Sequence, residues 1–205
     1  KADRNDIPRV WMDHGAWPLL TTELYIDQTG DLAFLLREQA YFKDSWIDRA
    51  QGRDEAWEET QGTGLRAADG SIYRGTVLEH LLVQHLTAFF NVGEHNIIRL
   101  EGADWNDGLD MAQERGESVA FTALYGGNLR RLAMLCRDLA SLGVTEVDLA
   151  SELTLLLDTL NNPLPYHLVP AKRARLENYF ATVGQAVAGR KARISLADLA
   201  SDLEA

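Results

Sequence analysis

Apolar residues recur at helical spacing over two long segments, and this pattern restricts the chain to a fold of packed helices more than any other feature. From Thr76 to Phe90, and again from Ser118 to Leu142, apolar side chains return every three or four residues. This period is typical of helices that bury one face. Residues 91–115 separate the two segments. We predict a well-buried inner helix, a loop and a second long helix.

The rest of the chain carries weaker helical patterns. Trp17–Gln28 predicts a helix, and a turn at 29–31 leads into apolar residues up to Tyr41, which we interpret as its partner in a helical hairpin. A polar connection of about 30 residues, 43–74, follows. It exceeds the usual loop length in a compact domain, and long ordered loops often carry function.

Beyond Gly143 the sequence predicts three more helices. One is leucine-rich and ends at 161–163, one lies near 171–188, and one opens at Ser195 with Asp198 in capping-box spacing. Only two short pieces resemble strands. Paired helices joined by loops predict an all-α fold, a toroid or bundle, that forms a single domain over residues 1–205.

Composition excludes several classes of function. The formal charge is −11, with 20 Lys and Arg residues spread along the chain, which opposes a nucleic-acid surface without excluding a local pocket for a small anion. The lone Cys136 excludes an internal disulfide and is expected to be a buried thiol. No apolar run is long enough to span a bilayer and no signal peptide is evident, so we expect a cytoplasmic protein. Because the chain begins at Lys1 without a methionine, we expect it to be part of a longer protein.

The most unusual segment is Glu101-Gly-Ala-Asp-Trp-Asn-Asp-Gly-Leu-Asp110, which places carboxylates, an amide and a tryptophan between two helices. An indole covers the apolar face of a sugar ring, carboxylates and amides bind its hydroxyls, and a carboxylic acid can protonate a glycosidic oxygen. Crowded acids beside a tryptophan also favour retention of one proton. A simple Asp/Asn/Gly turn explains the composition equally well. A calcium loop does not, because Arg115 stands where its closing glutamate belongs.

Cofactors and metals are not predicted. The chain has no glycine-rich phosphate loop, since Gly126-Gly127-Asn128 is too short and lies within a helical segment. His80 and His85 are five residues apart and do not form a metal pair on one helix face. Asp13 and His14 either line a sugar site or cap the helix that follows, and the two interpretations have equal weight.

At this point the residues resemble a known family. Asp-Trp-Asn-Asp-Gly at 104–108, followed by Gly-Glu-Ser-Val at 116–119, is similar to the signature of glycoside hydrolase family 94, the cellobiose and chitobiose phosphorylases and their relatives. The segment 9–19, with Asp13 and His14 before Trp-Pro-Leu, and the pair Glu79-His80 resemble further family segments in the same order. The resemblance covers about residues 9–135.

The resemblance implies a fold and a reaction. It implies that the chain is part of an (α/α)6 barrel and that Asp107 is the general acid of an inverting phosphorylase acting on β-linked glucosides. Inorganic phosphate would be the nucleophile and an α-sugar 1-phosphate the product. By the same resemblance, the substrate-binding residues are expected to be Trp105, Asp104, Asn106, Asp13, Glu79 and His80. Partners would be an oligosaccharide and phosphate, and a homodimer of the full-length protein stays open.

Two other functions remain open. The first is an inverting glycoside hydrolase on the same barrel, which needs a second carboxylate about 6.5 to 9.5 Å from the acid to activate water. Glu79, Asp13 or Asp104 could supply it. The second is a truncated carbohydrate-binding remnant without turnover, because the family's phosphate-binding residues lie downstream of the part that this resemblance covers. Leu109-Asp110 also departs from the family's usual methionine and asparagine.

Overall fold

The computed structural model describes residues 10–101, 112, 114–157 and 164–205. Within these residues most of the chain is helical, as predicted. The α-helices are α1 Ala16–Thr29, α2 Val77–Phe90, α3 Val119–Ser141, α4 Val169–Val183 and α5 Leu196–Glu204. Short 3-10 helices cover Met12–His14, Leu32–Leu36, Asp48–Ala50, Glu59–Gln61 and Ser151–Leu155.

Three helices begin at a side-chain cap. The hydroxyl oxygens of Thr76, Ser118 and Ser195 each accept a hydrogen bond from the backbone N–H three residues later, at 3.1, 3.2 and 3.4 Å. Each bond satisfies one of the amides that a helix leaves unpaired at its start. Helix α1 ends at Gly30, whose φ of 71° is the left-handed conformation that favours glycine. The caps therefore fix these ends where the sequence predicts them.

Strands occur as three two-stranded antiparallel pairs in the described residues. β1 Glu38–Ala40 pairs with β4 Arg74–Thr76, β2 Trp46–Ile47 with β3 Gly52–Arg53, and β5 Glu146–Ala150 with β6 Lys191–Ser195. In the first pair Glu38 lies opposite Thr76, and in the third Glu146 lies opposite Ser195. The sequence predicted only two strand-like pieces, so this part of the prediction was incomplete.

Two predicted helices are wrong. The partner in the supposed hairpin is a single 3-10 turn, Leu32–Leu36, followed by β1. After Gly143 the leucine-rich segment begins with β5, in which Val147 and Leu149 are buried and Glu146 and Asp148 are exposed. This alternation has the period of a strand. A 3-10 helix, Ser151–Leu155, follows, and residues 158–163 lie outside the described chain.

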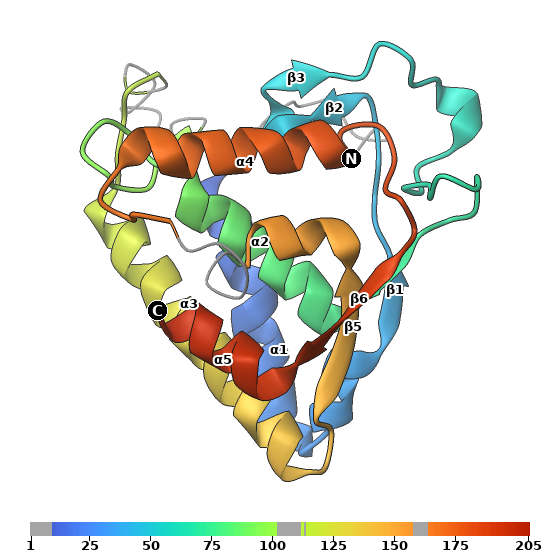
Figure 1. The fold of residues 1–205 in the computed structure, drawn as a ribbon, viewed down its shortest axis with the longest axis vertical. Coiled ribbons are helices and arrows are strands. Elements are labelled where there is room, and N and C mark those ends of the chain that lie inside the picture. The colour runs from blue at the N-terminus through green and yellow to red at the C-terminus, as the bar shows by residue number, and fades with distance from the viewer. Residues whose placement is uncertain (1–9, 102–111, 113, 158–163) are drawn as a thin grey trace.

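The core forms around α2, which packs against α1, α3 and α4. Helices α1, α2, α3 and α5 form a bundle, α4 lies across one end of it, and the β5–β6 ribbon follows one edge (Figure 1). Leu78, Leu81, Leu82 and Phe90 of α2 are at most 2% exposed. Cys136 is fully buried in the same core, as predicted, and burial raises its pKa to about 12.

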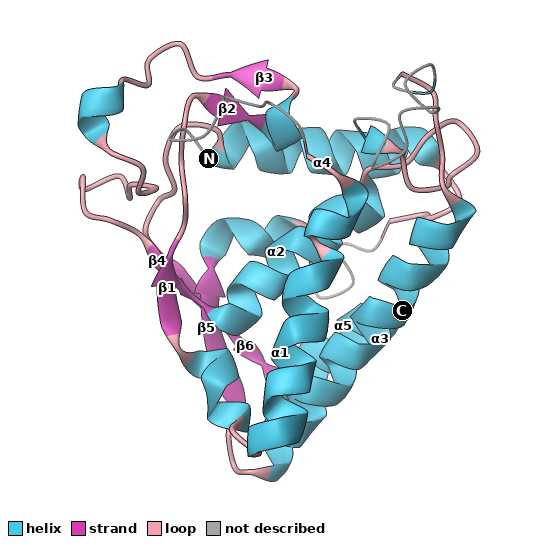
Figure 2. Ribbon diagram, turned by 180° about the vertical axis from the view of Figure 1, so that it is seen from behind, coloured by secondary structure: helices cyan, strands magenta, loops and turns pink. Residues whose placement is uncertain are grey.

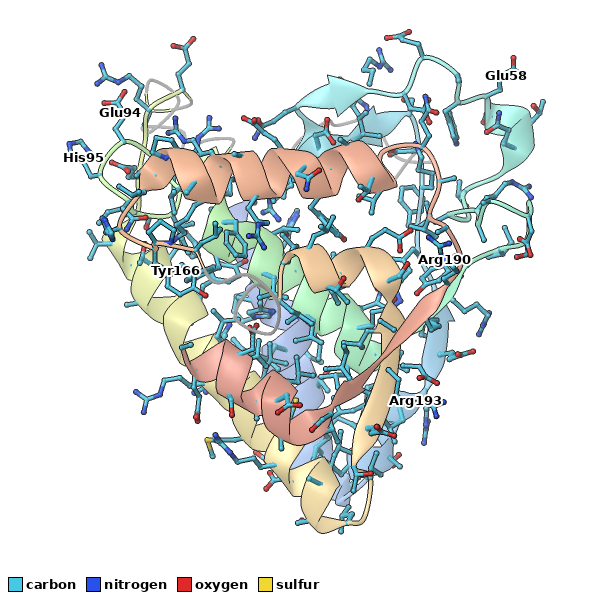
Figure 3. The ribbon with its side chains drawn as sticks, viewed as in Figure 1. Glu58, Glu94, His95, Tyr166, Arg190 and Arg193 are labelled. Carbon is cyan, nitrogen blue, oxygen red and sulfur yellow. The ribbon has the colours of Figure 1, made fainter. Side chains whose placement is uncertain are left out.

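The strands β2 and β3 lie at the end of the bundle that α4 crosses (Figure 2). The loop after α2 reaches the same end, at the beginning of α4, where Asn96 Nδ2 donates to the carbonyl of Tyr166 at 2.9 Å (Figure 3). Segments far apart in the sequence therefore meet at one end of the molecule. No helix among the described residues is long and apolar enough to cross a membrane.

Candidate active site

The predicted acid Asp107 and its neighbours Asp104, Trp105 and Asn106 lie outside the described residues. The chain on either side of them is described. The Leu100 N–H donates to the carbonyl of Gly116 at 2.8 Å, and Arg99 and Glu117 form an antiparallel bridge. These contacts hold the chain just before residue 102 beside the chain that follows residue 111.

Glu117, the glutamate of the Gly-Glu-Ser-Val segment, anchors this junction. Its carboxylate accepts hydrogen bonds from the backbone N–H of His95 at 2.9 Å, from His95 Nδ1 at 2.6 Å and from the Ile97 N–H at 3.4 Å. Burial would raise the pKa of Glu117, but these hydrogen bonds outweigh it and hold the pKa below its usual value. A Cβ at Gly93 would lie 2.3 Å from this carboxylate, so the glycine leaves the space that Glu117 occupies.

Tyr125 of α3 connects two distant parts of the sequence near the same junction. The side chain is 1% exposed, and its hydroxyl donates to the carbonyl of Met12. Burial raises its pKa to about 12, and the charges of Arg49, Glu101 and Asp13 all act on the hydroxyl. Asp13 and Glu101 therefore lie around one buried group.

Asp13 itself lies in the 3-10 turn before α1. Its Oδ2 accepts a hydrogen bond from the indole N–H of Trp17 at 2.8 Å, one helical turn later. The His14 ring packs edge-on against Trp11, with 5.0 Å between ring centroids. The interpretation of Asp13 and His14 as caps of α1 is wrong, because the helix begins after Gly15 without a side-chain cap hydrogen bond. Contact of Asp13 with a sugar stays a prediction.

Glu101 is held by a buried ion pair that the sequence does not reveal. Arg49 contacts both oxygens of its carboxylate, with distances from 2.6 to 2.9 Å, and Asn91 Nδ2 donates to Oε1 at 2.6 Å. The side chains of Arg49 and Glu101 are only 12% and 7% exposed. The ion pair therefore fixes Glu101, the first residue of the segment that carries the motif.

A cleft of about 950 Å³ opens beside these groups, between α4 and the loops on either side of the motif. Residues from both of those loops line it, and so do polar side chains of α4. Its charged and amide side chains are Asp48, Gln51, Asn91, Glu94, Arg99, Glu114, Arg115, Arg173, Glu177 and Gln185. Carboxylates, amides and guanidinium groups are the side chains that bind sugar hydroxyls. The cleft is therefore the candidate active site.

The predicted residues Glu79 and His80 lie elsewhere, at the first turn of α2. Glu101 contacts Asn91 just beyond the other end, and twelve residues at about 1.5 Å per residue separate Glu79 from Asn91 by about 18 Å. Glu79 is fully buried. The His80 ring stacks on Tyr41, with 3.7 Å between centroids, and burial lowers its pKa. The structure therefore does not bring Glu79 and His80 next to Glu101, where the motif segment begins. Their role in substrate binding stays a prediction.

A second cavity, of about 290 Å³, lies along α2 beneath α4. Glu79, Arg49 and Thr87 all line it, together with aromatic side chains that include Trp46. Sequence reasoning missed Arg49, which lines this cavity, and Tyr125, whose partner is Met12. No local pattern could have found them, because they act through partners far away in the sequence. Among the described residues no group of three His, Cys, Asp or Glu side chains could hold a metal ion.

Comparison with known proteins adds two findings. The family model described as the catalytic domain of the glycosyl hydrolase 94 superfamily matches residues 65–143. Solabiose phosphorylase from Paenibacillus borealis is 28% identical over 134 residues, which is 64% of this chain and 14% of that protein. The matched region thus covers about one seventh of the length of this curated relative. The family match includes α2, the acidic motif and α3.

Proposed function

We propose that this chain belongs to glycoside hydrolase family 94 and that it is the part of an inverting glycoside phosphorylase that carries the general acid, Asp107. The substrates are a β-linked oligosaccharide and inorganic phosphate, and the helices described above form part of an (α/α)6 barrel in the full-length protein. The single observation that carries the proposal is the match of the catalytic-domain family over residues 65–143, which contain Asp-Trp-Asn-Asp-Gly.

The proposed reaction is one displacement at the anomeric carbon. Asp107 donates its proton to the glycosidic oxygen, the bond between that oxygen and the anomeric carbon breaks, and a phosphate oxygen forms the new bond from the opposite face. The β-linked sugar leaves as an α-sugar 1-phosphate. Phosphate is already an anionic nucleophile, so the reaction needs no second carboxylate as a base, in contrast to inverting hydrolysis.

The surroundings of the cleft support this proposal. Asn91, Gln185 and the carboxylates that line it offer hydrogen bonds to sugar hydroxyls. Arg99 and Arg173 bring positive charge into the same cleft; each donates to a backbone carbonyl, that of Glu114 at 3.4 Å and that of Val92 at 2.9 Å. Asp13 is proposed to bind the sugar together with Asp104, Trp105 and Asn106. Glu79 is not suited to activate water, because it is fully buried and both its oxygens accept hydrogen bonds from the protein.

The test is release of sugar 1-phosphate from a panel of β-linked glucose and N-acetylglucosamine disaccharides, with and without inorganic phosphate. The chain and its full-length parent are compared with their Asp107→Asn variants. We expect phosphate-dependent product from the parent and a loss of about 100-fold or more in the variant, as for removal of a general acid. Asp27→Asn, which changes an exposed carboxylate of α1, is the matched control and should keep full activity.

Other outcomes identify the alternatives. Sugar release that does not depend on phosphate would replace this proposal with an inverting hydrolase. Sugar binding without turnover, in both chain and parent, would indicate a carbohydrate-binding remnant. Full activity of the Asp107→Asn variant would remove Asp107 from its role whichever reaction occurs.

A further inference from the structure

The segment Asp48–Ala50 has an unusual backbone. All three residues carry a Cβ and all three are left-handed, with φ of 52°, 56° and 66°. L-residues avoid this conformation because the Cβ approaches the following carbonyl oxygen, and consecutive examples are rare. Such strain persists only where surrounding contacts over-determine it, and it concentrates at functional sites. The contacts that hold this turn therefore deserve a functional explanation.

The turn delivers the Arg49 side chain to Glu101. Arg49 Nη2 donates to Oε2 of Glu101 at 2.6 Å, Nε lies 2.9 Å from both carboxylate oxygens, and Nη1 donates to Thr87 Oγ1 at 3.1 Å. Burial would lower the pKa of Arg49, but the charge and hydrogen bonds of Glu101 outweigh burial and raise it above its usual value. The guanidinium is thus charged and fixed in one orientation.

Glu101 is consequently held from two directions. Arg49 reaches it from the strained turn, and Asn91 Nδ2 reaches it from the end of α2, at 2.6 Å. The preceding residue, Leu100, is hydrogen-bonded to Gly116 beyond the motif. Asp107 follows Glu101 by six residues. The position of Glu101 therefore sets where the chain that carries the proposed acid begins.

Stability alone is a weak explanation for this arrangement. A buried ion pair is often no more stabilising than apolar side chains of the same shape, because both charges must leave water. The fork of an arginine, in contrast, fixes the direction of a carboxylate through several hydrogen bonds at once. A displacement of about 1 Å at a reacting group can cost about 100-fold in rate.

We propose that Arg49 is a positioning residue that acts through Glu101 on the proton donor of the proposed reaction. This inference rests on the proposed function. In this role Arg49 acts through its ion pair with Glu101, the first residue of the segment that carries the acidic motif. Its loss should affect transfer of the proton to the leaving group more than binding of the sugar.

The experiment uses the full-length parent with Arg49→Lys, which keeps the charge and loses the fork, and Glu101→Gln, which keeps the shape and loses the charge. Each variant is assayed on a β-linked disaccharide and on the corresponding β-glucosyl fluoride. Fluoride leaves with little need for a proton donor, so it separates a misplaced acid from a damaged fold. Arg193→Lys is the matched control, because Arg193 forms an exposed pair with Asp148 at 3.1 Å (Figure 3).

We expect kcat on the disaccharide to fall about 10-fold to 100-fold in both variants, with KM within about threefold of the unaltered enzyme. Activity on the fluoride should stay within about threefold, and Arg193→Lys should match the unaltered enzyme on both substrates. An equal fall on disaccharide and fluoride would overturn the inference, because the variants would then have damaged the whole site. Unchanged kcat in both variants would also overturn it.

The same assay separates this inference from the proposed function. If the unaltered parent shows no phosphate-dependent product, or if Asp107→Asn keeps its activity on the disaccharide, the proposed function fails and the inference fails with it. If Asp107→Asn loses the disaccharide and keeps the fluoride while Arg49→Lys keeps both, the proposed function stands and the inference alone is wrong.

Discussion

Replacement of Glu79 by alanine is expected to destabilise this chain more than the loss of any exposed ion pair. The carboxylate is fully buried and accepts hydrogen bonds from four donor groups. Oε1 accepts from the hydroxyls of Tyr41 and Tyr73 at 2.9 and 3.0 Å. Oε2 accepts from the Ala150 N–H at 2.8 Å and from Lys191 Nζ at 3.2 Å. One side chain thus joins α2 to two of the strand pairs.

The magnitude follows from the partners that Glu79→Ala leaves behind. A buried donor without a partner costs about 1–3 kcal/mol, and removal of one member of a buried pair costs about 3–5 kcal/mol. The four contacts do not add, because they share one carboxylate. Lys191 keeps a second bond, to the carbonyl of Arg74 at 2.8 Å, and its side chain is 26% exposed, so water can solvate it. We therefore expect Glu79→Ala to lower the free energy of unfolding by about 3–5 kcal/mol.

Urea denaturation followed by circular dichroism measures this change. In a chain of 205 residues it corresponds to a fall in Tm of roughly 6–20 °C. Glu79→Gln should lose about half as much, because the amide keeps the shape and two of the contacts. Asp148→Asn, in an exposed pair with Arg193, is the control and should show no measurable change. If Glu79→Ala loses no more than this control, the described hydrogen bonds do not hold the strand pairs to α2.

Two further predictions concern packing and pH. Gly15→Ala should destabilise the chain by about 1–3 kcal/mol in the same urea assay, because its Cβ would lie 2.4 Å from the Tyr125 hydroxyl, whereas Gly127→Ala meets nothing within 4 Å and should stabilise α3 by about 0.5–1 kcal/mol. Burial lowers the pKa of His85 to about 4, below its unfolded value of about 6.5, so its contribution of roughly 3 kcal/mol is present above about pH 6.5 and is lost as pH falls toward 4. As the pH is lowered from 7 to 4, the free energy of unfolding should decrease less steeply in His85→Gln than in the unaltered chain. An equal slope in both proteins would contradict this assignment.

The helices could be predicted from the sequence where their signals are local. Thr76 is the N-cap of α2 and Ser195 that of α5, and in both cases the cap and the apolar period lie within a few residues of each other. The strand pairs depend on distant partners. β5 pairs with β6 across more than 40 residues, and β1 pairs with β4 across more than 30. An apolar run such as Leu32–Leu36 has no local feature that distinguishes a full helix from one turn before such a strand.

The candidate site likewise contains residues that the sequence reveals and residues that it does not. The acidic motif could be found because its residues are adjacent in the sequence. Arg49 could not, because its partner is 52 residues away and its backbone conformation opposes local preference. Tyr125 lies on a helix that was predicted correctly, yet its contact with Met12 spans 113 residues. The apolar periodicity of α3 identifies the buried face of the helix. It does not identify which buried side chain contacts a distant segment near the site.

Three glutamates near the motif or in the family segments show why the proton donor is sought within residues 102–111. A general acid must present a carboxyl oxygen to the leaving group. Glu79 is fully buried, and Glu101 is 7% exposed with both oxygens bonded to Arg49. Glu117 accepts three hydrogen bonds from the loop after α2, and its lowered pKa favours the charged form. Each of these carboxylates accepts hydrogen bonds that fix the fold, so none is free to give a proton to a sugar. Asp107, which lies between Glu101 and Glu117 in the sequence, stays the proposed acid.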